Sequence, residues 1–165
     1  MIESIQTLIN ALRAELEQYG EMLALLDRQR QSVTARSADE VFQSIAPIKA
    51  QGAVIQEARA RREECRAQVA RKLDREADAS FADLIPLLPA DYRPLVQALV
   101  EENNALLVRV RQRARQNHLL LSRSLEMMAG LINTFFPSRE TRVYNEQGNM
   151  RLRGLGMRPI YEAVG

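Results

Sequence analysis

The chain has 165 residues, of which 46% are hydrophobic, and its 23 basic and 21 acidic side chains leave a net charge of +2. This near balance argues against a nucleic-acid binder, which normally gathers basic charge on one face, and the single Cys excludes an intramolecular disulfide. The sequence shows neither a signal-peptide pattern nor an apolar run of membrane-spanning length, so we expect a cytoplasmic protein without stable membrane insertion.

A stripe of apolar residues at helical spacing predicts a first helix over about residues 2–32. Its members are Ile5, Leu8, Leu12, Leu16, Tyr19, Leu23, Leu26 and Val33. After a short break, Ser37 and Glu40 have the spacing of a capping box, so we expect a second helix to begin near Ala38. A short connection between two long helices predicts an antiparallel hairpin.

The second helix carries a thinner apolar seam, formed by Val41, Phe42, Ile45, Ile48, Ile55, Ala58, Cys65, Val69 and Leu73. Pro47 lies inside this seam, and an interior Pro removes a backbone hydrogen bond, so we expect the helix to be interrupted near Pro47. Residues 59–76 are dense in charge of both signs. They could form a basic binding face, but we favour a solvated surface with ion pairs of mixed sign.

A connector at residues 77–90 is expected to hold a short helical turn that Ser80 caps and that Pro86 and Pro89 end. From Asp91 to Phe135, a third apolar stripe predicts one helix on the order of 65 Å long at 1.5 Å per residue. The stripe consists of Tyr92, Leu95, Leu99, Asn103, Leu106, Val110, Ala114, Asn117, Leu121, Leu125, Met128, Ile132 and Phe135.

The helical period is lost after Phe136 and Pro137, in a segment that holds four of the seven Gly residues. Such a composition buries too little apolar area to offset the entropy of ordering, so we expect disorder there. The sequence therefore predicts an all-α protein. We expect an elongated antiparallel bundle of about three long helices over residues 1–136 and a flexible tail over residues 137–165.

Catalytic patterns are missing from the sequence. One His (His118) and one Cys (Cys65) cannot form a zinc site of the usual ligand number, and no Gly-rich loop precedes a helix as phosphate binding requires. We expect a protein that is not an enzyme and that uses no cofactor and no metal.

The C-terminal part of the long helix is apolar around most of its circumference, more than the first helices can cover. Wide surfaces rich in Met and Leu suit adaptable docking of a partner, although core packing is the alternative. Asn117 lies on the same stripe and leaves two readings open. It either fixes the register of helix packing or occupies an exposed groove that a partner contacts.

Residues 117–125 (NHLLLSRSL), the Met-rich turn after them and residues 143–148 (VYNEQG) resemble the FlgN family of flagellar type III export chaperones. The order of the predicted helices is also similar to that family. The resemblance implies a cytoplasmic chaperone that masks amphipathic terminal helices of hook–filament junction proteins and delivers them to the export gate.

The resemblance also implies partner-binding residues in this chain. The client surface would comprise Leu121, Leu125, Met128, Leu131, Ile132 and Phe135, with Asn117 as a further partner-binding residue. Tyr144 would dock on the export gate, and the expected partners also include ATPase components of the secretion apparatus. Two alternatives stay open: a homodimeric coiled-coil adaptor without a dedicated client, and a nucleic-acid or membrane-surface binder that the charge balance disfavours. The sequence leaves the oligomeric state undetermined.

Overall fold

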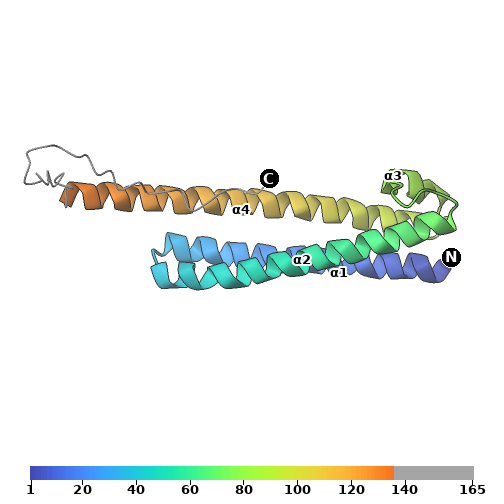
Figure 1. Cartoon of the computed structure of the whole chain (residues 1–165), viewed down its shortest axis with the longest axis horizontal. Coiled ribbons are helices and arrows are strands. Elements are labelled where there is room, and N and C mark those ends of the chain that lie inside the picture. Colours follow the sequence, from blue (N-terminus) through green and yellow to red (C-terminus); the bar gives the residue numbers. More distant parts are fainter. Residues whose placement is uncertain (136–165) are drawn as a thin grey trace, which may run out of the picture. The chain divides into compact units, whose positions relative to one another are not determined.

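The computed structural model describes residues 1–135, which are almost entirely helical and contain no strand. Figure 1 shows the helices, and the described segments are α1 (Ile2–Thr34), α2 (Ala38–Lys72), α3 (Phe81–Leu84), the 3₁₀ helix η1 (Ile85–Leu87) and α4 (Arg93–Phe135). The all-α class is confirmed. The three predicted long helices are α1, α2 and α4, and the short α3, in the connector where a helical turn was expected, brings the number of α-helices in the described residues to four.

The chain divides into two compact units, Met1–Ser124 and Leu125–Gly165. The first contains α1, α2, α3, η1 and most of α4, and the second is described as far as Phe135. The predicted tail at 137–165 lies outside the described residues, so the boundary at residue 136 stays a prediction.

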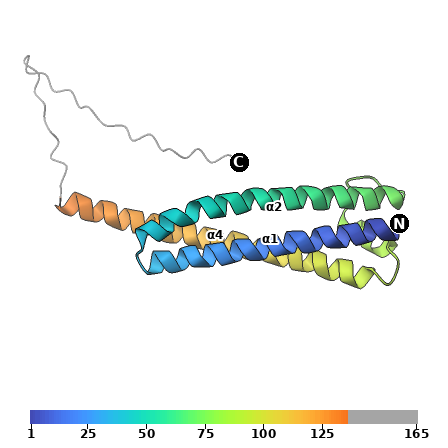
Figure 2. The same ribbon diagram turned by 90° about the horizontal axis from the view of Figure 1, so that it is seen from below.

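Helices α1 and α2 form the predicted antiparallel hairpin (Figure 2). Side-chain hydrogen bonds join the two helices at three places. As the residue number in α1 rises, the residue number of its partner in α2 falls, as expected for antiparallel helices. The pairs are Ser4 with Lys72, Gln18 with Gln51 and Gln29 with Ser44. The connection is only three residues long, and Arg36 within it has a positive φ of 58°.

Pro47 does not interrupt α2, which is continuous from Ala38 to Lys72, so that prediction is wrong. Pro47 is exposed, and so is Gln43, whose carbonyl loses its usual N–H partner to the proline. Water can therefore replace the missing bond. The predicted seam is also wrong at Phe42 and Ile45, because these side chains are 78% and 53% exposed.

The two predicted helix caps differ in outcome. Ser37 is the N-cap of α2, but its side chain makes no capping hydrogen bond, so the predicted capping box with Glu40 is not formed. Ser80 caps α3 in a complete capping box with Asp83. Hydrogen bonds that the Asp83 carboxylate accepts from Ser80 hold the pKa of this group below its usual value.

The part of α4 that belongs to the first unit runs alongside α1 in the same direction (Figure 1). Two asparagines of α4 donate hydrogen bonds to α1: Asn103 Nδ2 to the Leu12 carbonyl at 3.0 Å and Asn117 Nδ2 to the Leu26 carbonyl at 2.7 Å. Each donor lies 91 residues after its acceptor. The two asparagines are 14 residues apart, which is two repeats of the seven-residue period of packed helices.

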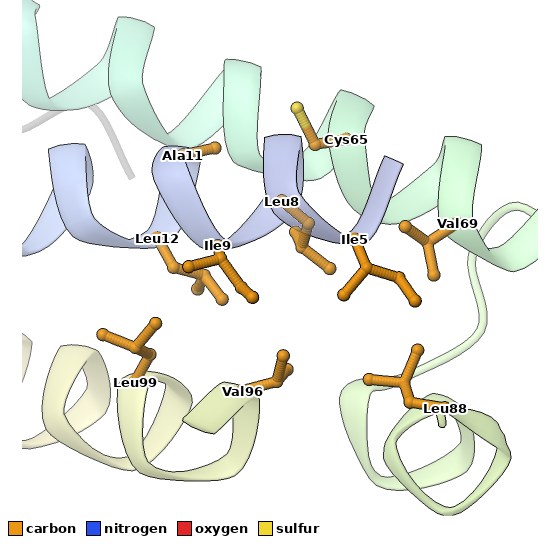
Figure 3. Close-up of a cluster of buried hydrophobic side chains, with 10 residues drawn as sticks. All are labelled: Ile5, Leu8, Ile9, Ala11, Leu12, Cys65, Val69, Leu88, Val96 and Leu99. Atoms are coloured by element: carbon orange, nitrogen blue, oxygen red, sulfur yellow. The ribbon is translucent and has the colours of Figure 1, made fainter. Parts of the chain in front are cut away.

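An apolar cluster joins α1, α2, α4 and the residue that follows η1. In Figure 3, side chains of α1 point toward Val96 and Leu99 of α4 and toward Leu88. The buried members are Ile5, Leu8, Ile9, Ala11, Leu12, Cys65, Val69, Leu88, Val96 and Leu99. Burial of these side chains is the main term that stabilises this end of the first unit.

A second buried cluster contains Tyr19, Met22, Leu26 and Ile55. Between the two clusters, α1 carries the buried side chain of Glu15. Its Oε2 lies 3.1 Å from Arg62 Nε, and its Oε1 accepts a 2.7 Å hydrogen bond from the Tyr19 hydroxyl. The Arg62 guanidinium also lies 6.0 Å from the centre of the Phe81 ring.

The Tyr19 phenol makes folding sensitive to alkaline pH. Burial, reinforced by the hydrogen bond to Glu15, raises the pKa of Tyr19 from 10.0 to about 12. Below pH 10 the phenol is protonated in both states, whereas between pH 10 and 12 only the unfolded chain releases this proton. We therefore expect the free energy of unfolding to fall by about 2–3 kcal/mol over this interval through Tyr19 alone.

Urea unfolding at several pH values tests this expectation with Tyr19→Phe as the reference protein. The variant lacks the titrating group, so its free energy of unfolding should fall less steeply above pH 10 than that of the wild type. Parallel curves for the two proteins would show that Tyr19 does not titrate as described.

Candidate partner-binding surface

The second unit begins with a helical segment whose large apolar side chains are exposed. These are Leu125, Met127, Met128, Leu131 and Ile132, and their exposed fractions run from 56% to 67%. Single exposed apolar residues are common on proteins, but five within eight positions of one helix form a continuous patch. We call these five residues the apolar face of α4.

Helical geometry places the five side chains on one side of the segment. At 3.6 residues per turn, they span an arc of roughly 160° around the helix axis. The remaining positions carry small or polar residues, and Glu126 is the only charged residue between Leu125 and Phe135. An arc this wide ordinarily faces a protein core.

Leu, Met and Ala favour the helix in this segment, and Gly130 is the one residue that opposes it. No neighbouring atom requires a glycine there, because a Cβ added to Gly130 would meet nothing within 4 Å. Thr134 Oγ1 donates to the Gly130 carbonyl at 2.8 Å. Gly130 therefore lowers the helix propensity of this segment without serving a close packing contact.

Asn117 lies in the first unit and is not exposed, since only 2% of it is accessible. Besides the bond to Leu26, its Nδ2 donates to Gln29 Oε1 at 3.1 Å, and Gln29 Nε2 donates to Ser44 Oγ at 2.9 Å. One chain of side-chain hydrogen bonds thus joins α4, α1 and α2. These contacts fit the register-fixing reading, and a role for Asn117 in partner binding stays a prediction.

The other predicted partner-binding residues have different positions. Leu121 is half-buried in the first unit, whereas Leu125, Met128, Leu131 and Ile132 belong to the apolar face. The Phe135 side chain and the whole of Tyr144 lie outside the described residues.

The predicted site residues omitted Met127 of this surface, and the sequence analysis gave no packing role to the buried Asn103. Met127 belongs to the apolar face although it lies off the thirteen-residue stripe, and only the width of the apolar region signals it. Asn103 is buried and packs as Asn117 does, which the spacing of 14 residues could have indicated.

The one Cys and the one His of the chain both lie among the described residues. Burial raises the pKa of the Cys65 thiol, which disfavours the reactive thiolate, and His118 is exposed on α4. Among residues 1–135, no group of three or more His, Cys, Asp or Glu side chains is arranged to hold a metal ion. No helix in that part of the chain is long and apolar enough to cross a membrane.

Comparison with known proteins gives one match. A family model described as FlgN protein matches residues 1–152 of the 165. No curated protein and no solved structure matches the sequence.

Proposed function

The chain belongs to the FlgN family, and from that membership we propose that it chaperones hook–filament junction proteins before their export through the flagellar secretion apparatus. Membership supports the general role of a flagellar export chaperone. The client, the binding residues and the route of delivery are parts of the proposal.

The observation that carries the proposal is the apolar face of α4. Subunits that polymerise through amphipathic terminal helices expose apolar stripes before assembly, and a helical apolar face can cover such a stripe. Met127 and Met128 add side chains that adapt to different partner surfaces. We propose that Leu125, Met127, Met128, Leu131 and Ile132 contact the client, with Leu121 and Phe135 as predicted extensions of the contact.

Delivery would require a second contact, with the export gate or its ATPase components in the cytoplasm. The proposed contact residue is Tyr144, by its match to the family pattern around residues 143–148. Replacing Tyr144 by Ala should then leave client binding unchanged and reduce export of the client.

Light scattering after size-exclusion chromatography tests the central part of the proposal. The full chain of 18.7 kDa is mixed with a purified, unpolymerised hook–filament junction subunit. We expect a stable complex of defined mass and a loss of spontaneous subunit polymerisation. Absence of a complex would contradict the proposal.

The same experiment separates this function from that of a homodimeric adaptor. An apolar face that pairs with its own copy would give a particle of twice the chain mass in the absence of client. A tight dimer that excludes the subunit would favour the adaptor.

A further inference from the structure

The part of α4 that lies in the first unit carries an unbalanced run of positive charge. Between Asn103 and Leu125 the sequence has five Arg residues and no Asp or Glu. They are Arg109, Arg111, Arg113, Arg115 and Arg123. Arg113 Nε lies 3.0 Å from Asp27 Oδ1 of α1, and within residues 1–135 no ion pair involves the other four.

In the Arg-rich segment of α2, by comparison, acidic side chains of the same chain neutralise the arginines. There Arg62 and Arg66 both pair with Glu63, at 2.7 and 2.8 Å, and Arg62 also reaches Glu15. In α4, by contrast, Arg109 and Arg113 lie on one side of the helix at i,i+4 spacing, an arrangement that weakens an isolated helix, and only Arg113 has an acidic partner among residues 1–135. An external anion would relieve this repulsion.

An open groove of about 390 Å³ lies between α1 and α4, lined by Leu23, Asp27, Arg109, Gln112, Arg113 and Gln116. Helical spacing extends the α4 side of this groove through Leu120 to Arg123. Arg109 and Arg123 are thus on one stripe, 14 residues or roughly 21 Å apart. We call the stripe from Arg109 to Arg123, with Leu23 and Asp27, the basic groove.

We propose that the basic groove binds an acidic segment of a partner protein, one whose carboxylates are spaced to meet Arg109 and Arg123. Leu23 and Leu120 offer apolar contacts between the two charges, and the Gln112 and Gln116 amides supply hydrogen bonds. This partner is distinct from the client of the apolar face. The proposal therefore goes beyond the function given above.

The charges in the groove select a protein segment over other anions. The Asp27 carboxylate lines the groove beside Arg113, so a dense row of phosphates would meet a like charge, whereas a peptide can place its carboxylates away from it. Residues 137–165 of this chain are a poor occupant, because their five Arg outnumber their three Glu.

Fluorescence anisotropy with the full chain provides the test. The probe is a labelled synthetic helix of about 18 residues, long enough to pass both arginines, with Glu and Leu on one face. We expect the double variant Arg109→Glu, Arg123→Glu to bind it at least about tenfold more weakly, because two attractive contacts become repulsive. The control is the double variant Arg61→Glu, Arg71→Glu, which lowers the net charge of the chain by the same amount but at α2. It should weaken binding of the peptide by less than about twofold.

Circular dichroism shows whether each variant is folded. If the double Glu variant unfolds, the double variant Arg109→Gln, Arg123→Gln is used instead, because it removes the two positive charges without adding negative ones. Equal weakening by the α4 and α2 variants would overturn the proposal, since net charge alone would explain binding. Tighter binding of duplex DNA or anionic vesicles through the same arginines would also overturn it. The double variant Leu125→Asp, Met128→Asp should keep peptide binding, which separates this surface from the apolar face.

Discussion

Replacing Leu125 and Met128 together by Asp should abolish binding of an unpolymerised hook–filament junction subunit while the chain stays folded. Both side chains are mostly exposed in the free protein, so the substitution removes no core contact. In the complex it would remove about 1.5–3 kcal/mol of apolar burial at each position and bury two unpaired carboxylates. A total above about 4 kcal/mol corresponds to a loss of affinity of roughly a thousandfold, measurable by isothermal titration calorimetry.

Two controls make this result specific. The pair Phe42→Asp and Ile45→Asp adds the same charges to another exposed apolar site, in the first unit, and should leave binding unchanged. Gly130→Asp places an Asp in the same helical segment but outside the apolar arc and should have little effect. Equal affinity of the wild type and the Leu125, Met128 variant would remove the apolar face from the proposal.

Replacing Asn117 by Asp should destabilise the first unit by about 2–4 kcal/mol. The Asn117 amide nitrogen donates to two acceptors, the Leu26 carbonyl and Gln29 Oε1, and the side chain is almost completely buried. An Asp of the same shape would present an ionised oxygen to both acceptors. Urea unfolding should show the loss at neutral pH, and the loss should shrink in acid, where a protonated carboxyl can donate again.

Asn104→Asp provides the matched control, because Asn104 is exposed on the same helix. Its free energy of unfolding should stay within about 0.5 kcal/mol of the wild type. If Asn117→Asp is equally mild, the hydrogen bonds from α4 to α1 do not hold the register of the bundle.

Periodicity explains which parts of the fold the sequence could predict. The stripes from Ile5 to Leu26 and from Leu99 to Val110 mark core-facing sides of α1 and α4, because apolar residues repeat with the helical period where one side is buried. Capping chemistry correctly located the short α3 after Ser80. The family resemblance, based on residues around Asn117 and Tyr144, is confirmed by the match over residues 1–152.

Other features depend on tertiary context that a linear pattern does not carry. Pro47 remains inside α2 because it lies on an exposed side of the helix, and Phe42 has helical spacing but no neighbour to pack against. The sequence left open whether Asn117 packs between helices or lies in an exposed groove. The structure shows that its amide donates to the Leu26 carbonyl, a contact that no local pattern in the sequence indicates. The buried contact of Glu15 with Arg62 joins residues 47 positions apart, which no local spacing indicates.

Hydrogen–deuterium exchange of the full chain, with and without an unpolymerised junction subunit, tests the central claim most directly. Peptides that cover residues 125–135 should exchange more slowly in the complex, because client contact would stabilise the backbone hydrogen bonds of this helical segment. A complex that forms while these peptides exchange at an unchanged rate, with protection confined to residues 1–124, would contradict the claim.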